Sequence, residues 1–441
     1  MPQHIEQVDT EFAQFLHAFP AQWEQMRRQM GAFTSGGKIA SPKELLRAIF
    51  LYCGPDQSLR EVAGTLTLQA QRLTDQAVWK RLNRCTSFLR ALFKHLLGLD
   101  DLPPIPNGLR FIAYDGTTLE CPGATGTDYR LHLGIDLATL RFHAIHVSDT
   151  TMGERLKHSH WQPGDVALVD QGYCSHSGIF DVVYDKGADV IVRWNHHRSL
   201  YHADDRRRAL DFAAVFKSQK PGTLASQSVV LKYTQSKKHP VQDSRELLGY
   251  LYAYRLTQAE AKVAQKRVSR KHQKKQKKLT EKTLLLCQFV CVFTSLSPAQ
   301  ADMETILALY RCRWQIELAI KRLKSLIHLD TLRAKQGSQL AEVYLYGKVL
   351  YIWLIEREMR ATFGEDWGQL DRERQGTPWR LYKLLKARVD AVVLAQWLWK
   401  AHAVTACLHV MMERPRKRKL QSLPRRIVNV GLLLDHLPTA A

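Results

Sequence analysis

Five apolar segments of strand length limit what this chain can fold into more than any other feature. They cover residues 109–119, 129–137, 140–149, 165–173 and 187–195. The first three follow one another with short turns, and a helix-like segment at 176–187 separates the last two. Antiparallel strands that lead into strands alternating with helices predict a mixed α/β sheet.

The segments on either side of this sheet predict other structures. Residues 1–105 read as helical, with amphipathic runs at 44–53, 58–66 and 74–84 and with Ser58 and Thr74 as N-cap residues. The last run is basic, and its exposed cations are predicted to contact DNA: Lys80, Arg81 and Arg84. A helix-turn-helix that enters the major groove and an ordinary helical bundle explain this region equally well.

Residues 196–283 interrupt the sheet pattern and predict a β-rich insertion with strands at 223–233 and 246–256. A basic run at 262–278 follows, which indicates phosphate contact, although such a run can also be a solvated helix face. The residues expected to contact DNA there are Lys266, Arg267, Arg270 and Lys271. A buried strand at 283–296 then leads back to the core.

The expected division of the chain is into residues 1–105, 106–195, 196–283, 284–337 and 338–441. The first is a helical DNA-binding region, and the second and fourth form the core. The third is the β-rich insertion. The fifth is helical, suits dimerisation, and ends in a basic tail at 413–426.

The net charge of +22 points to a polyanion as partner, and nucleic acid is the usual one. A basic protein of the membrane surface is the competing class. No window of 18 uncharged apolar residues occurs, and the first residues have no apolar signal core. The eight cysteines contain no CxxC pair and predict reduced thiols. We therefore expect a soluble protein of the cytoplasm with no membrane partner.

Residues 310–324 read as one helix with a polar stripe. At about 100° per residue, Tyr310, Arg313, Glu317 and Lys324 fall within an arc of about 60°. An adjoining apolar stripe would hold the helix against a core. A carboxylate between cations and a phenol suits a metal ion beside a phosphate, whereas an exposed Arg–Glu pair at i,i+4 is the plainer explanation.

Two aspartates make the metal-site interpretation stronger. Asp115 and Asp170 each follow an apolar run, so each is expected to leave a buried strand at a turn. If Glu317 packs across those strands, the three carboxylates converge, and they suit two Mg²⁺ ions, with Mn²⁺ as a substitute. Two such ions can drive in-line phosphodiester chemistry by activating the attacking oxygen and stabilising the leaving one.

In this combination the chain resembles the insertion-sequence-four family of bacterial DDE transposases. The family signature of Tyr, Arg, Glu and Lys is present with its spacing as Tyr310, Arg313, Glu317 and Lys324. The two aspartate motifs of the family match Tyr114-Asp115-Gly116-Thr117 and Asp170-Gln171-Gly172-Tyr173. The resemblance covers residues 108–195 and 285–336, and a β-rich insertion between the second aspartate and the glutamate is also a family feature.

The resemblance implies a ribonuclease H-like catalytic core of the retroviral integrase type, in which Asp115, Asp170 and Glu317 are the catalytic and metal-binding residues. It implies a homodimer that pairs two transposon ends, cleaves them and joins the 3′-hydroxyl strands to target DNA. Tyr310, Arg313 and Lys324 would then position the terminal phosphate and a flipped base. In relatives a DNA hairpin can form at the cleaved end, and an aromatic residue of the last insertion strand helps to hold the flipped base. Where relatives often have a tryptophan four residues before Thr294, this chain has Val290, so the neighbouring Phe289 is the candidate for this DNA contact.

Two other functions use many of the same residues. A ribonuclease H-like nuclease or resolvase would need the three acids without the Tyr–Arg–Lys stripe. A DNA-binding derivative of a transposase would need the cations without the acids, so the intact acid set argues against it.

Overall fold

The computed structural model describes residues 10–394 apart from a small set of short segments. Those segments are residues 18, 34–38, 40, 70–71, 97–107, 150–152, 154, 234–244 and 365–377. The basic tail predicted at 413–426 lies outside the described residues. No described helix is long and apolar enough to cross a membrane.

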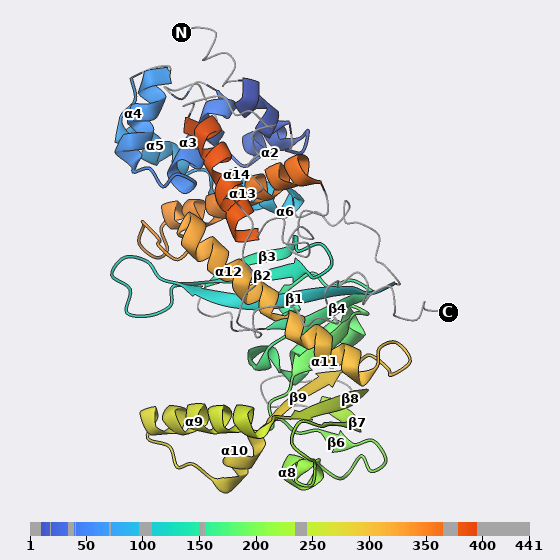
Figure 1. Ribbon diagram of the computed structural model, residues 1–441. Helices are drawn as coiled ribbons and strands as arrows, with labels where there is room; N and C mark the ends of the chain where they lie inside the picture. The colour runs from blue at the N-terminus through green and yellow to red at the C-terminus, as the bar shows by residue number, and fades with distance from the viewer. Residues whose placement is uncertain are drawn as a thin grey trace.

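A nine-stranded mixed sheet forms the centre of the molecule, with strand order β3-β2-β1-β4-β5-β9-β8-β7-β6 (Figure 1). The strands are β1 (Arg110–Leu119), β2 (Tyr129–Asp136), β3 (Phe142–Asp149), β4 (Asp165–Val169), β5 (Asp189–Arg193), β6 (Tyr201–His202), β7 (Leu224–Tyr233), β8 (Arg245–Arg255) and β9 (Phe289–Thr294). Strands β1, β4 and β5 are parallel, and the other neighbours are antiparallel. The predicted mixed α/β sheet is confirmed.

The insertion continues this sheet. Strand β9 pairs with β5 of the core on one edge and with β8 of the insertion on the other. Helices α8 (Phe212–Phe216), α9 (Gln258–Lys274) and α10 (Glu281–Leu286) complete the insertion. The prediction of a strand over 283–296 was wrong at its start, because Thr280 caps α10 by accepting a hydrogen bond from Thr283 N at 3.2 Å.

Alternation of side chains gives the sheet two buried faces. Phe111 and Ala113 of β1 belong to the core shared with the long helices, whereas Ile112 and Tyr114 belong to a second core. The second face is covered by α7 (His176–Phe180), the one-turn helix η5 (Asp181–Asp185) and α8. The short helices η3 (Leu156–His158) and η4 (Gln171–Tyr173) adjoin this side.

Helices α11 (Met303–Cys312) and α12 (Trp314–Ile327) cross the first face, as Figure 1 shows. Helix α11 packs on β4, β5 and β9, and α12 packs on β1 and β2. The single helix predicted over 310–324 is thus two helices that adjoin at Arg313. The backbone of that residue stays right-handed, with φ −49° and ψ −30°, so the polar stripe survives the break.

The N-terminal helices pack against the C-terminal ones. They are α2 (Trp23–Gln29), α3 (Pro42–Cys53), α4 (Leu59–Gln69), α5 (Asp75–Leu82) and α6 (Thr86–Leu96), with residues 10–16 also helical. Helix α13 (Gln339–Phe363) contacts α3, α6 and α14 (Pro378–Leu394). The predicted caps are confirmed, because Ser58 and Thr74 accept hydrogen bonds from the third residue of α4 and of α5.

Candidate active site

The parallel pairing of β1 with β4 brings the two aspartates to neighbouring positions. Tyr114 is opposite Val169, so Asp115 and Asp170 are the next residues on adjacent strands. Tyr114 and Val169 belong to the second core, whereas Ala113 and Leu168 face the α11 and α12 side, so alternation turns both acids toward that side. The expectation that each acid leaves its strand at a turn holds for Asp170 only. Strand β1 continues past Asp115 to Leu119, because β2 pairs with it along its whole length.

Helix α12 supplies the third carboxylate. Glu317 lies in its first turn, where a negative side chain also interacts favourably with the helix dipole. Ile316, Ile320 and Leu323 are buried beneath the helix and hold it against the sheet. The side chains of Asp115, Asp170 and Glu317 are 23, 40 and 32% exposed, so all three can be reached from solvent.

One guanidinium group connects the acids. Arg313 donates to Glu317 Oε1 at 2.7 Å, and its Nη1 lies 3.8 Å from Asp115 Oδ2. The Tyr310 hydroxyl donates to Asp170 Oδ1 at 3.0 Å. Five residues that the sequence predicted to act together are therefore connected by these contacts and by the Arg313 guanidinium, which lies 5.8 Å from the centre of the Tyr310 ring. Along the chain, 202 positions separate Asp115 from Glu317.

Arg193 is a site residue that the sequence analysis missed. It ends β5 on the same sheet face, and its Nη1 lies 3.8 Å from Asp170 Oδ1. No sequence signal distinguished it, because an arginine at the end of an apolar run is common. Only the parallel pairing of β4 with β5 brings it to Asp170.

Burial and charge shift the pKa values of the site residues. Burial raises the pKa of Asp115 to about 6. The neighbouring Glu317 and Asp170 add to this rise, while the Gly116 N–H and Arg313 oppose it. Burial and the Asp170 carboxylate raise the pKa of Tyr310, so its hydroxyl remains a donor. Tyr310 and the acids raise the pKa of Arg313 despite its burial, so this side chain stays cationic.

A buried polar group supports β1 from the opposite face. The Tyr173 hydroxyl lies 3.2 Å from His132 Nδ1, and His132 Nε2 lies 3.3 Å from Ser148 Oγ. A Cβ atom on Gly116 would lie only 2.9 Å from that hydroxyl, which explains a glycine directly after Asp115. Tyr173 thus links the Asp170 turn to the strand that carries Asp115.

Oxygen ligands from three carboxylates on one face suit Mg²⁺ or Mn²⁺ in residue type. Among the described residues, however, no three histidine, cysteine or acidic side chains are already grouped closely enough to hold one ion. Arg313 lies between Asp115 and Glu317. The acids fit divalent cations once this guanidinium turns toward another anion, which a DNA phosphate would supply.

The other predicted residues lie in different places. Lys324 lies further along α12, half-buried, with its Nζ 4.0 Å from Asp330. Phe289 does not lie with the acids: it is 7% exposed and packs against Phe216 in the second core. It faces away because successive residues of β9 alternate, so that Val290 lies on the acids' side.

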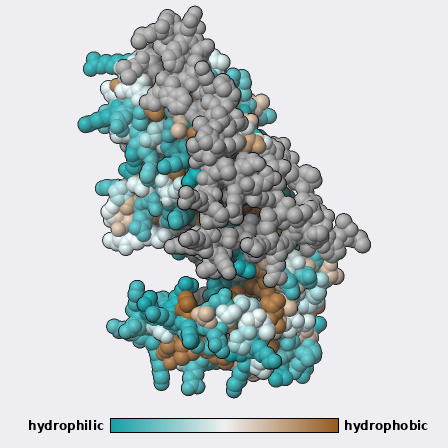
Figure 2. Space-filling model, in the orientation of Figure 1, coloured by the Kyte–Doolittle hydropathy of each residue, from teal (hydrophilic) through white to brown (hydrophobic). Residues whose placement is uncertain are grey.

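Two cationic surfaces lie outside the acid cluster. Lys80 on α5 and Arg84 just after the helix are exposed, whereas Arg81 is half-buried with its guanidinium 4.9 Å from the centre of the Phe33 ring. Helix α9 projects from the insertion (Figure 1), and its predicted contacts Lys266, Arg267, Arg270 and Lys271 are all exposed. Figure 2 shows a hollow between the lobe that carries α9 and the rest of the molecule.

The comparisons with known proteins agree with this geometry. The family model described as "Transposase DDE domain" matches residues 106–353, which is more than half of the chain. The chain is 29% identical over 339 residues to the putative transposase InsL for insertion sequence element IS186A of Escherichia coli strain K12. That match spans 76% of this chain and 90% of the relative.

Two further relatives carry similar names. The transposase for insertion sequence element IS421 of Escherichia coli is 29% identical over 341 residues and covers the same shares of both chains. The transposase for insertion sequence element IS231F of Bacillus thuringiensis subsp. israelensis is 26% identical over 206 residues, or 45% of this chain and 42% of the relative. With its family match, its two aspartate motifs and its Tyr–Arg–Glu–Lys stripe, the chain belongs to the DDE transposases of the insertion-sequence-four family.

Proposed function

We propose that this protein binds the terminal inverted repeats of an insertion sequence, cleaves the ends and transfers the 3′-hydroxyl strands to target DNA. The observation that carries the proposal is the set of contacts around the three acids: Arg313 contacts Glu317 and Asp115, and the Tyr310 hydroxyl donates to Asp170. A protein that only binds DNA gains nothing from three acids beside phosphates, because they repel its ligand.

The strand order supports a ribonuclease H-like core. Three antiparallel strands are followed by two that run parallel to the first, in the order β3-β2-β1-β4-β5. The acids lie at the centre of this order, on β1 and after β4, where both neighbours fix the backbone. A rigid backbone is what a catalytic constellation needs, because small displacements of ligands cost rate.

In this proposal Asp115, Asp170 and Glu317 hold two Mg²⁺ ions, which Mn²⁺ can replace. When bound, these ions activate an attacking oxygen and stabilise the leaving oxygen of the scissile ester. The protein groups align the DNA strand: the Arg313 guanidinium turns from the acids to a phosphate, and Arg193 stays on the Asp170 side to balance added negative charge. The raised pKa of Tyr310 keeps its hydroxyl protonated, so it can donate to a phosphate oxygen or a base.

The remaining cations support the grip on DNA. Lys324 extends the stripe beyond Glu317, and the exposed cations of α9 border the hollow seen in Figure 2. Helix α5 adds exposed cations among the N-terminal helices, at the opposite end of the molecule from α9 in Figure 1. We expect a homodimer to bring two ends together, with part of each end held by the other subunit. Phosphate contacts of this kind give affinity and position without reading sequence.

The test uses DNA that carries the insertion-sequence ends, a second plasmid as target, and Mg²⁺. Joining of the ends to the plasmid is the expected result. Cleavage without joining would assign the protein to the nucleases or resolvases, and salt-dependent binding without cleavage would make it a non-catalytic derivative. Asp115→Asn, Asp170→Asn and Glu317→Gln should each abolish cleavage and leave end binding in EDTA largely unchanged. A variant that still cuts removes its residue from the active site.

A further inference from the structure

The exposed face of α12 carries a line of cations that begins one turn beyond Glu317. At 100° per residue, Lys321 and Lys324 lie within about 40° of Glu317 around the helix. Lys321 is exposed and Lys324 half-buried, and the helix ends at exposed His328. Since an α-helix rises about 1.5 Å per residue, His328 lies roughly 16 Å from Glu317 along the axis.

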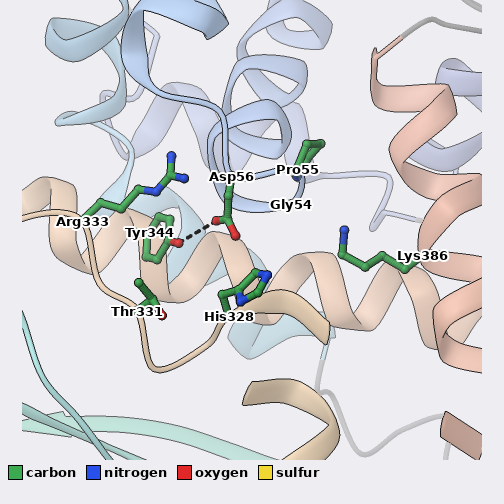
Figure 3. Close-up of a pocket in the computed structure, with 8 residues that line it drawn as sticks. All are labelled: Gly54, Pro55, Asp56, His328, Thr331, Arg333, Tyr344 and Lys386. Carbon is green, nitrogen blue, oxygen red and sulfur yellow. Dashed lines mark hydrogen bonds between the residues drawn. The ribbon is translucent and has the colours of Figure 1, made fainter. Parts of the chain in front are cut away.

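This line leads to a pocket of about 310 Å³ (Figure 3). Four parts of the chain form its wall: the loop after α3, the end of α12 with the loop that follows, α13 and α14. The lining residues are Gly54, Pro55, Asp56, His328, Thr331, Arg333, Tyr344 and Lys386. In the close-up, Arg333 and Lys386 lie on opposite sides, with Asp56 and His328 between them.

The charges of the pocket leave one cation uncompensated. The Asp56 carboxylate accepts hydrogen bonds from the Tyr344 hydroxyl and from Nζ of fully buried Lys348, each at 2.6 Å, so its charge is balanced. Lys386 pairs with Asp390 at 2.6 Å. Arg333 is exposed and forms no ion pair within 4.0 Å among the residues that the structure describes, although its charge acts on Glu61 from further away. An anion is therefore the ligand that this pocket favours.

The backbone of the pocket is strained in two places. Asp56 has φ 60° and His328 has φ 50°, two of the four positive φ values found at non-glycine positions in the described chain. Such conformations cost about 1–3 kcal/mol each and persist where the surrounding structure enforces them, often at binding sites. The buried Lys348 provides that constraint, because it donates both to Asp56 Oδ1 and to the Ile327 carbonyl at the end of α12.

We propose that this pocket binds a backbone phosphate of the DNA strand that passes the active site. The strand runs along α12 over Lys321 and Lys324. Its phosphate is held by the Arg333 guanidinium, with the Thr331 hydroxyl as a second donor and Lys386 opposite. This inference rests on the proposed transposase function. It adds a second DNA contact about 16 Å along α12 from Glu317, and this contact fixes which nucleotide of the strand lies at the acids.

Equilibrium binding to end DNA in EDTA tests the pocket separately from the chemistry. Arg333→Ala should lower the slope of log K against log salt by about 0.9, and should weaken binding about eightfold at 0.1 M salt. Arg333→Lys should keep the slope, because the charge stays. Lys186→Ala is the matched control: this exposed lysine follows η5 on the other face of the sheet, and its loss should change neither quantity.

Neutral methylphosphonates then locate the phosphate. At 3.4 Å per phosphate along one strand of a duplex, the pocket lies within about five nucleotides of the cleaved bond. One substitution should weaken binding of the wild type and have no effect on Arg333→Ala, as coupled groups require. Equal losses for both proteins at every position would overturn the proposal.

Inorganic phosphate separates a DNA contact from a site for a free anion. If phosphate raises the Tm of the DNA-free wild type but not of Arg333→Ala, while DNA binding does not depend on Arg333, the pocket takes a free anion and the DNA proposal is wrong. Absent cleavage with Arg333-dependent binding would instead reject the transposase function and leave the pocket assignment intact. Because Arg333 takes part in no ion pair among the described residues, the Arg333→Ala protein should keep the wild-type Tm.

Discussion

The Arg313 guanidinium contacts the carboxylate oxygen atoms that divalent cations would bind in the proposed function. It reaches Glu317 at 2.7 Å and Asp115 at 3.8 Å, within a cluster whose acids raise one another's proton affinity. A fixed positive charge between two carboxylates opposes a second positive charge there. In the proposed function, the same arginine would therefore limit metal affinity in the free protein and gain a new partner when a phosphate arrives.

Replacing Arg313 with Gln should raise the affinity of the free protein for Mn²⁺ at least about fivefold, since the competing charge is gone. Electron paramagnetic resonance of free Mn²⁺, without DNA, measures this directly. Arg313→Lys should change the affinity little, and Tyr310→Phe, which removes a hydroxyl but no charge, serves as the control. Equal Mn²⁺ affinity for Gln and Arg at this position would contradict the competition.

At the residue scale, the sequence predicted the acids but not their supports. Asp115 and Asp170 each follow an apolar run, and Glu317 lies on the polar stripe of a predicted helix, so a local pattern marks each acid. Arg193 and His132 carry no such signal. Their roles depend on the pairing of β4 with β5 and of β1 with β2, which is a property of three-dimensional register rather than of any local run.

Among the elements, β8 and β9 illustrate how closely the insertion fits the core. A Cβ atom on Gly249 of β8 would lie 2.5 Å from the Phe293 ring and 2.7 Å from the Thr294 carbonyl oxygen. Strand β9 must therefore approach β8 where no side chain intervenes, and this approach joins the insertion to β5.

Gly249→Ala should lower the free energy of unfolding by about 1–3 kcal/mol, the usual cost of overpacking a tight interior. Gly64→Ala is its counterpart in α4, where a Cβ atom would meet nothing within 4 Å. That change should be neutral or should stabilise by up to about 1 kcal/mol through helix propensity. Chemical denaturation measures both, and a Gly249→Ala protein as stable as wild type would show that β8 and β9 can separate.

Helix α9 is held by little except its own caps. Thr257 and Glu260 form a capping box at its start, and Ala261 is its only buried residue. Replacing Lys266, Arg267, Arg270 and Lys271 with Gln should therefore leave the Tm unchanged. If the helix contacts DNA, the salt slope of binding should fall by up to about 0.9 for each lost phosphate contact. Lys217→Gln with Lys220→Gln, exposed lysines beside α8, should leave the slope as it is.

The sequence predicted most types of element, but it did not predict where one helix is divided or where two sheets join. Period and capping residues located several helices and every described strand except β6, but not α8 or α10. They could not show that 310–324 is divided at Arg313, since this residue keeps helical dihedral angles, nor that β9 extends the core sheet into the insertion. Both depend on packing partners that are distant in sequence.

At the scale of the whole molecule, the described N-terminal helices and helices α13 and α14 share one core with the sheet face that α11 and α12 cover. Buried residues of α3, α12, α13 and α14 belong to this single cluster. Glu356 of α13 is inside it: Tyr382 of α14 donates a hydrogen bond to the carboxylate, and Arg322 of α12 lies over the Tyr382 ring. Burial raises the pKa of Glu356 to about 7.

This pKa predicts a pH dependence of global stability. Between the unfolded value near 4.5 and the folded value of about 7, the folded protein holds a proton that the unfolded chain has lost, so the free energy of unfolding falls as pH rises. The loss amounts to about 3 kcal/mol over this window. Glu356→Gln should flatten this part of the profile and stabilise the protein above pH 7.

Thermal unfolding between pH 4 and 8 provides the measurement. Glu358→Gln is the comparison, because Glu358 lies two residues away and pairs with Arg388 at 2.7 Å. Its loss should lower stability without flattening the profile. A Glu356→Gln profile as steep as wild type would show that another group titrates.

The double membership of β9 has a mechanical consequence. The backbone of β9 is hydrogen-bonded to β8 on one edge and to β5 on the other, so a force applied to α9 is transmitted across the sheet to Arg193 at the end of β5. Arg193 in turn lies 3.8 Å from the Asp170 carboxylate. A hinge would absorb such a force, whereas a stiff sheet transmits it. If α9 holds DNA as proposed, tension in that DNA would reach the Asp170 carboxylate with no moving lobe in between.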